Sequence, residues 1–96
     1  MPTASWNGAV IAEASGDAVR IVEDIVYFPP EAVNPAYLQR SEHVSVCPWK
    51  GAANYYHLAV DGKVNENAAW CYPAPFDAAS AIAGHIAFWR GVEVRA

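Results

Sequence analysis

The sequence predicts a single small, mainly β domain with one or two short helices. Short runs rich in Val, Ile, Tyr, Phe and Trp recur along the chain and are separated by Gly, Pro, Asn and Asp, which is typical of strands and turns. Only one segment, residues 76–83, is alanine-rich in the way expected of a helix. A chain of 96 residues, 54% of them hydrophobic, suits one core, so residues 1–96 are predicted to form one domain.

Short strands are predicted along the whole chain, at residues 10–13, 25–28, 43–47, 55–60, 68–72, 85–89 and 92–94. A further apolar run at 18–22 follows the turn residues 15–17. Pro29-Pro30 ends the run at 25–28, because proline cannot donate a hydrogen bond to a sheet. Asp61-Gly62 predicts a tight hairpin, because a type I′ turn requires positive φ at both central positions.

Two regions are predicted to be helical, and both are short. Residues 30–40 hold at most one or two helical turns, because Pro35 interrupts any longer helix. Residues 76–83 are the stronger helix prediction, since they are rich in alanine and begin near Asp77, which suits an N-cap.

The charge pattern argues against several kinds of partner. Six basic and ten acidic residues give a net charge of -4, and no Lys/Arg cluster is present, so no nucleic acid is expected as a partner. No apolar run approaches the roughly 18 residues of a membrane helix, and no basic segment precedes an apolar one at the start. We therefore expect no membrane association and a cytoplasmic protein whose two cysteines, Cys47 and Cys71, are reduced.

The stretch CPWKG, residues 47–51, joins two predicted strands and concentrates chemically distinctive side chains. Cys47 stands where a thioredoxin-type pair would begin, but Lys50 occupies the second cysteine's position, so dithiol exchange within the motif is excluded. Lys50 could instead lower the pKa of the Cys47 thiol and make it a nucleophile. We favour the alternative, a semi-buried structural cysteine, because free cysteines are usually buried.

A metal site has weak support in the sequence. Zinc ligands must converge, and structural zinc sites commonly contain C-x-x-C pairs, which are absent here. We therefore predict no metal and no cofactor, although the residues that could supply zinc ligands from separate strands are His43, Cys47, His57, Cys71 and His85.

A ligand pocket is the stronger prediction. Lys50 lies at a turn, Tyr55 lies on the following strand, and Trp70 and Tyr72 project together from the next. Aromatic walls with one or two polar groups are typical of small-molecule pockets. We expect Lys50 to be a surface-reaching side chain of little importance to stability that meets an anionic or carbonyl group of the ligand. The alternative is that the aromatic side chains only fill the core of a small β domain.

Four motifs together resemble one protein family. They are YFPPEAV at 27–33, CPWKGAANYY at 47–56, AAWCYPAPF at 68–76 and AIAGHIAFW at 81–89. They resemble, in this order, the bacterial domain of unknown function 427 over about residues 8–94. The resemblance implies a mostly antiparallel β fold of the tent type, similar in shape to the zinc-binding cereblon-like and methionine sulfoxide reductase B domains. Those relatives bind zinc through C-x-x-C pairs, so the resemblance implies a tent held together by packing.

The same resemblance implies a set of site residues. The positions that match the family's motifs are Tyr27, Cys47, Lys50, Tyr55, Trp70 and Tyr72, with Glu23 matching an acidic position before the YFP run. The family is sometimes labelled nucleotidyltransferase-like. Such an enzyme needs paired acidic residues for magnesium, and no D-x-D occurs here.

Three functions follow from these observations. The preferred prediction is a domain that binds an unknown small molecule in an aromatic pocket around the CPWKG turn. The second is a protein-interaction or homodimer assembly module, because 12% aromatic and only 17% charged residues leave apolar surface to cover. The third is a thiol-dependent or nucleotidyltransferase-like enzyme.

Overall fold

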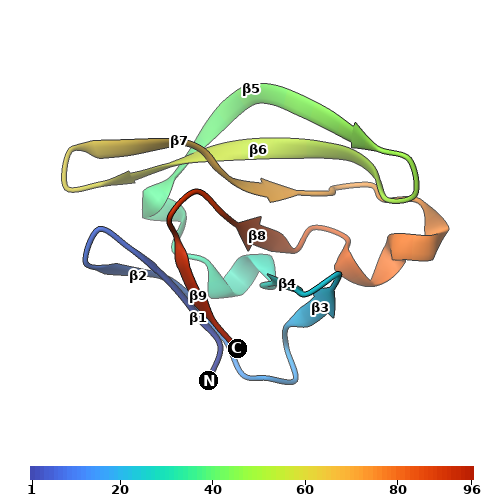
Figure 1. The fold of residues 1–96 in the computed structure, drawn as a ribbon, viewed down its shortest axis with the longest axis horizontal. Helices are drawn as coiled ribbons and strands as arrows, with labels where there is room; N and C mark the ends of the chain where they lie inside the picture. The colour runs from blue at the N-terminus through green and yellow to red at the C-terminus, as the bar shows by residue number, and fades with distance from the viewer.

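The computed structural model describes residues 1–96 and is mainly antiparallel β, as the sequence predicts (Figure 1). A three-stranded sheet, in the order β2-β1-β9, contains β1 (Thr3–Trp6), β2 (Ala9–Glu13) and β9 (Glu93–Arg95). A separate hairpin contains β3 (Arg20–Val22) and β4 (Ile25–Tyr27). The largest sheet contains, in spatial order, β5 (Leu38–Cys47), β6 (Gly51–Val60), β7 (Lys63–Cys71) and β8 (Ile86–Phe88).

The helices are three short 3-10 segments: η1 (Pro30–Ala32), η2 (Pro35–Tyr37) and η3 (Asp77–Ile82). Proline occupies the first position of η1 and of η2, where its missing N–H leaves no hydrogen bond unmade. Asn34 caps η2 by accepting a hydrogen bond from the Ala36 N–H at 3.0 Å. The longest helix has six residues, so none of the helices could cross a bilayer.

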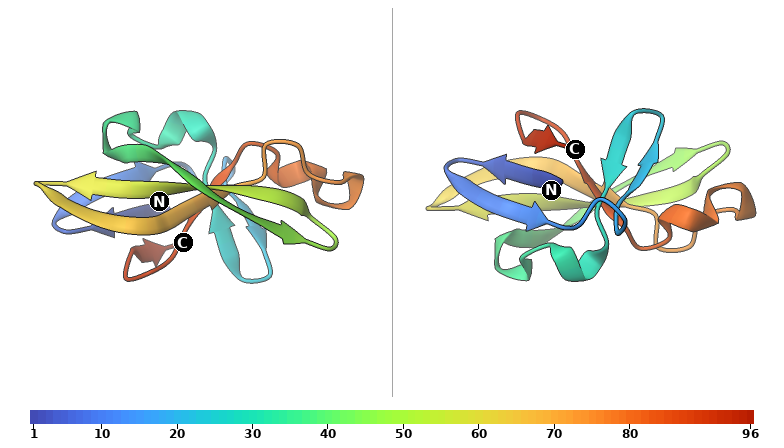
Figure 2. Two further views of the ribbon diagram at one scale, coloured as in Figure 1. Left: turned by 90° about the horizontal axis from the view of Figure 1, so that it is seen from above. Right: turned by 90° about the horizontal axis from the view of Figure 1, so that it is seen from below.

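The long strands lie above two smaller units, as Figures 1 and 2 show. The β1–β2 hairpin, with β9 beside it, lies under one half of the long strands. The β3–β4 hairpin projects beneath the other half, near the end where η3 lies. The long strands therefore face the β2-β1-β9 sheet along one half and the β3–β4 hairpin along the other.

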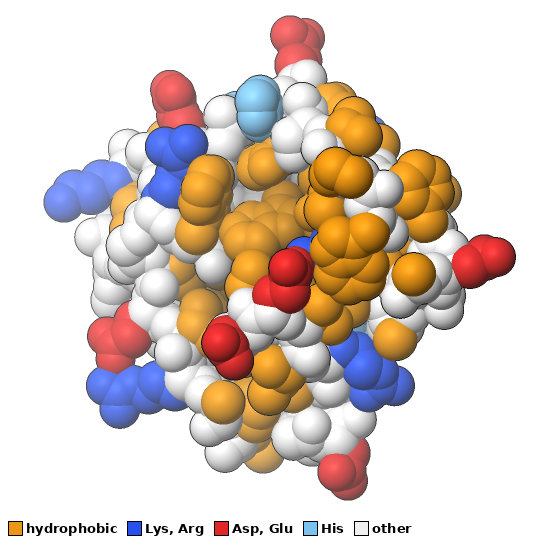
Figure 3. Space-filling view, turned by 45° about the vertical axis from the view of Figure 1, so that its right-hand side comes forward, with side chains coloured by type: hydrophobic (Ala, Val, Ile, Leu, Met, Phe, Trp, Pro, Cys, Tyr) orange, Lys and Arg blue, Asp and Glu red, His pale blue; other side chains and the backbone are white.

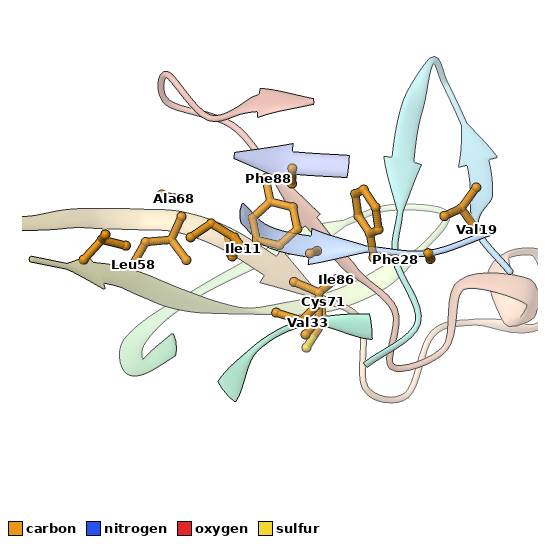
Figure 4. Close-up of a cluster of buried hydrophobic side chains, with 14 residues drawn as sticks. Ile11, Val19, Phe28, Val33, Leu58, Ala68, Cys71, Ile86 and Phe88 are labelled. Carbon is orange, nitrogen blue, oxygen red and sulfur yellow. The ribbon is translucent and has the colours of Figure 1, made fainter. Parts of the chain in front are cut away.

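The first core cluster fills the space between the two larger sheets. Phe28 and Phe88 meet edge to face with ring centroids 5.8 Å apart, and both side chains are buried. Figure 4 shows the cluster as a continuous row with Leu58 at one end and Val19 at the other. All 14 buried members are apolar apart from the thiol of Cys71.

The second core cluster lies on the opposite face of the long sheet. Successive side chains of a strand point to opposite faces, so Ile86 and Phe88 join the first cluster while Ala87 joins the second. The second cluster has six buried members, namely Tyr27, Ala53, Tyr72, Ala79, Ile82 and Ala87. Two of the predicted site residues, Tyr27 and Tyr72, belong to this cluster, and Cys47, Tyr55 and Trp70 pack against it.

Several predicted elements differ in extent from the observed ones. The strand β1 was not predicted, and the predicted strands 43–47 and 68–72 begin earlier, at Leu38 and Lys63. Pairing with β6 extends both, because each forms a long antiparallel ladder with it. The segment predicted as a helix at 76–83 is the 3-10 helix η3, which is interrupted because Ala79 has non-helical backbone angles.

Candidate functional site

Lys50 is the only charged side chain that the fold buries, with 4% of its surface exposed. It ends the turn between β5 and β6, and its carbonyl accepts a hydrogen bond of 2.9 Å from the Phe76 N–H. The following Gly51 has a φ of +111° and lies against the backbone of Pro75 and Phe76. The turn is therefore held in place by the segment that precedes η3.

The Lys50 ammonium is surrounded by one carboxylate, one hydroxyl and three aromatic rings. It forms an ion pair with Glu23 of the β3–β4 turn and donates to the Tyr27 hydroxyl at 3.4 Å. Its nitrogen also lies 5.9 Å, 5.2 Å and 5.8 Å from the ring centroids of Tyr27, Trp49 and Tyr72. Aromatic faces attract cations at these distances, so the surroundings stabilise a positive charge.

The electrostatics keep Lys50 protonated at neutral pH. Burial by itself would lower its pKa, but the hydrogen bond to Glu23 and the interactions with Tyr27 outweigh burial, so the pKa lies above the ordinary 10.5. Burial also raises the pKa of the Tyr72 hydroxyl, so this neighbour stays neutral. Lys50 therefore acts here as a cation and hydrogen-bond donor, and its protonated amine is no nucleophile.

Glu23 reaches Lys50 from a conformationally unusual turn. Glu23 and Asp24, between β3 and β4, have φ values of 55° and 63°. Positive φ at both central positions belongs to type I′ turns, which favour Asn and Gly. The other turns with such a pair, Asn7-Gly8, Asp61-Gly62 and Arg90-Gly91, each contain a glycine.

Aromatic side chains continue from the Lys50 group across the sheet. Trp70 lies perpendicular to Tyr27 with centroids 6.4 Å apart and is 6.5 Å from Tyr55, its partner on the neighbouring strand. The Tyr55 hydroxyl shares a hydrogen bond of 2.9 Å with Ser45, and the Tyr55 ring lies 4.6 Å from His43. Figure 3, turned toward this end of the molecule, shows a hollow among hydrophobic side chains, with a basic group almost hidden beneath an acidic one.

Sequence reasoning missed Trp89 and Arg90 as neighbours of this aromatic group. The Trp89 ring lies 5.6 Å from that of Trp70, and the Arg90 guanidinium stacks 4.5 Å from the Trp89 ring. The Trp89 indole N–H donates to the Asn67 carbonyl at 2.5 Å. Residues 90–91 separate the predicted strands 85–89 and 92–94, but their position beside Trp70 depends on the pairing of β7 with β8.

The residues predicted to form the site lie together. Tyr27 and Tyr72 are buried in the second core cluster, and Cys47, Tyr55 and Trp70 pack against it. Lys50 contacts the rings of both tyrosines, and Glu23 pairs with it. The expectation of a surface-reaching Lys50 is wrong, because the turn directs its side chain inward among aromatic rings.

The two cysteines differ in environment, and both are free thiols. Cys47 is half-buried against the second core cluster and makes no hydrogen bond with Lys50, whose partners are Glu23 and Tyr27. Burial raises the pKa of the Cys71 thiol, so Cys71 is protonated at neutral pH. No three His, Cys, Asp or Glu side chains gather in a way that could hold a metal ion.

The one distinct cavity of the molecule lies away from Lys50. It has a volume of about 300 Å³ and lies against β4, β8 and β9, where it is lined by Asp24, Ile25, Val26, Phe88, Val94 and Ala96. Its lining is apolar apart from Asp24. Two places in the molecule are therefore candidates for a ligand, and only the Lys50 group offers a buried charge.

A family model matches nearly the whole chain. The family model described as a domain of unknown function, DUF427, and labelled NTP_transf_9 matches residues 3–96. This range is wider than the 8–94 expected from the motifs and covers every residue of the Lys50 group. A search of curated proteins finds no match.

Proposed function

The chain belongs to the DUF427 family, and we propose that it binds a small molecule that carries an anionic group. Lys50 holds that group, and Tyr27 adds a hydroxyl beside it. The rings of Tyr55 and Trp70 form the wall against which the rest of the ligand packs. The observation that carries this proposal is the burial of a single protonated lysine among aromatic rings.

Physical chemistry supports an anion as the ligand's recognised group. A buried cation is costly unless an anion or hydrogen-bond acceptor compensates it, and the low local dielectric strengthens that interaction. Charge-assisted hydrogen bonds to carboxylate or phosphate are the strongest that an ammonium forms. Half-buried rings beside it supply apolar contact area, as in most small-molecule sites.

The enzyme alternatives have less support from the same geometry. A thiol-dependent mechanism needs Cys47 beside an activating group, and the ammonium of Lys50 is already paired with Glu23. A nucleotidyltransferase-like mechanism needs converging carboxylates to hold magnesium. Glu23 is the carboxylate at this site, and its partner is a cation.

The proposal is tested by a ligand-observed NMR screen of small organic acids and phosphates against three proteins. These are the wild type, Lys50→Met, which removes the buried charge, and Lys63→Met, which removes an exposed charge at the start of β7. We expect anions that bind the wild type and Lys63→Met and lose binding to Lys50→Met. Hits that bind all three proteins equally would contradict a role for Lys50.

A second candidate is a homodimer interface at the β5–β6 turn. Three exposed hydrophobic side chains lie there or beside it: Val46, which is 73% exposed, Trp49 and Phe76. The Phe76 N–H donates a hydrogen bond to the Lys50 carbonyl, so this apolar surface adjoins the site. Light scattering at high protein concentration should report a dimer for the wild type. It should report a monomer for Val46→Lys, which places a charge in the apolar surface. A monomeric wild type would remove this candidate.

We also propose that the protein acts in the bacterial cytoplasm. Two free thiols, one of them buried, suit a reducing compartment. Protein taken directly from cells is denatured and treated with a thiol-labelling reagent. We expect both cysteines to react, and two oxidised cysteines that do not react would contradict a reducing compartment.

A further inference from the structure

We propose that the Lys50 site recognises a carboxylate and that Glu23 occupies it as a tethered substitute for the ligand. This inference rests on the proposed function and names the chemical class of the recognised group. The carboxylate of Glu23 is the anion paired with the Lys50 ammonium, and the Tyr27 hydroxyl lies beside that ammonium. An incoming carboxylate finds the same two donors once Glu23 has moved away.

The burial of the two partners is unequal, and this asymmetry permits an exchange. The side chain of Lys50 is 5% exposed, whereas that of Glu23 is 57% exposed. Glu23 therefore approaches the ammonium from the solvent side. It can turn into water by rotating its own side chain, and its charge is then hydrated at little cost. Lys50 has no such freedom and needs a replacement anion.

The backbone at Glu23 indicates that its side chain has a role. Positive φ is unfavourable for residues other than glycine, asparagine and aspartate, and Glu23 adopts it with a φ of 55°. The three other paired turns place glycine at the second position. The ion pair with Lys50 accounts for a glutamate at the tip of this hairpin.

Asp24 provides a matched control within the same turn. It carries the same charge and a similar backbone angle, but it lines the cavity against β4, β8 and β9. It forms no ion pair with Lys50. Removing Asp24 therefore changes the charge of the turn without changing the group that fills the site.

A tethered carboxylate competes with a free one through its effective concentration. Groups on short flexible tethers reach effective concentrations of about millimolar or more. Removal of Glu23 should therefore tighten the binding of a free carboxylate about tenfold or more. The wild type, by contrast, selects ligands whose remaining atoms add contacts with the aromatic wall.

The experiment is a rescue of Glu23→Ala by sodium acetate. The substitution deletes one methylene and one carboxylate, which acetate replaces with nearly the same atoms. The melting temperature is measured in sodium acetate, sodium phosphate and sodium chloride at equal ionic strength. We expect acetate to raise that of Glu23→Ala by about 3–6 °C relative to chloride. Smaller effects are expected for wild type and Asp24→Ala, and none for Glu23→Ala/Lys50→Met.

Several outcomes would overturn this inference. They are an equal acetate effect in Asp24→Ala, an effect that persists in the double variant, and no acetate effect in Glu23→Ala. A larger effect of phosphate than of acetate on the melting temperature of Glu23→Ala would mean that the site recognises phosphate and not carboxylate. The proposed function, binding of an anion at Lys50, would still hold. If the wild type binds anions that depend on Lys50 but acetate does not rescue Glu23→Ala, the role of Glu23 as a tethered substitute is refuted and the proposed function is not.

A second variant keeps the test decisive if Glu23→Ala does not fold. Glu23→Gln preserves the length of the side chain and removes its charge. Its affinity for acetate, measured by NMR titration, should exceed that of wild type about tenfold. Equal affinities for Glu23→Gln and Asp24→Asn would contradict the inference.

Discussion

The two core clusters lie on opposite faces of the same sheet and differ in chemistry. The first, between the two larger sheets, contains 14 buried residues that are apolar apart from one thiol. The second, which includes Tyr27 of the β3–β4 hairpin, contains two buried tyrosines and surrounds the only buried charge, that of Lys50. The same strands build both, because Ile86 and Phe88 point one way and Ala87 the other.

This difference separates the part of the molecule that stabilises it from the part that we propose binds a ligand. An apolar cluster gains stability from burial alone, at about 25 cal/mol per Å². A buried ion pair adds little net stability, because desolvation offsets attraction. A small domain with a limited core therefore has little to gain from a buried lysine unless the lysine has another role.

The largest expected effect comes from the first cluster. Phe28→Ala removes a ring that is fully buried and packed on Phe88, so it should lower the free energy of unfolding by about 3–5 kcal/mol. Urea denaturation measures this change. A cost below about 1 kcal/mol would mean that this cluster does not dominate stability.

A second prediction distinguishes the clusters by pH. Burial raises the pKa of Cys71 in the first cluster above its ordinary 9.0, so its contribution to stability is complete below that value and is lost as the pH rises through the raised pKa. The pKa of Lys50 is also raised, from 10.5, so its contribution is lost only at higher pH. The pKa values of Tyr56 and Tyr72 are also raised above the ordinary 10.0, so their contributions to stability are likewise lost as the pH rises above that value.

Urea denaturation between pH 8 and 11 tests this order. We expect Cys71→Ala to remove the earliest part of the alkaline loss and Lys50→Met to remove only a later part. Cys47→Ala serves as the control, since it removes the other free cysteine of the chain. A wild-type stability that rises above pH 9 would contradict the sign of these shifts.

The smallest expected effect on stability is that of Lys50→Met. Methionine fills a similar volume, and Glu23, which is more than half exposed, stays hydrated after its partner is lost. The free energy of unfolding should therefore change by less than about 1 kcal/mol, while anion binding is lost. A loss similar to that of Phe28→Ala would mean that Lys50 serves mainly the fold.

The local features of the fold were predictable from the sequence because local chemistry determines them. Asp61-Gly62 forms a hairpin turn with φ values of 50° and 78°, as the type I′ preference predicts. Tyr55 and Trp70 were placed on neighbouring strands, and they pair directly. Helix 76–83 was predicted from composition, but Ala79 interrupts it, because short alanine-rich segments depend on packing for their geometry.

The long-range features of the site were not predictable in the same way. Lysine is rarely buried, so the sequence alone favours an exposed Lys50. Its burial requires the β3–β4 hairpin to bring Glu23 and Tyr27 over the turn, and these residues are distant in the chain. Family resemblance pointed to Glu23, but only the folded geometry shows it as the partner of Lys50.

The most direct test of a ligand site at Lys50 is a protein-observed NMR titration of the wild type with the tightest anion found in the screen. It compares the two places where a ligand could lie. A ligand bound at Lys50 should change the chemical shifts of the Trp70 indole and of the Tyr27, Lys50 and Gly51 amides. Changes confined to Val26, Phe88 and Val94, around the apolar cavity, would contradict it.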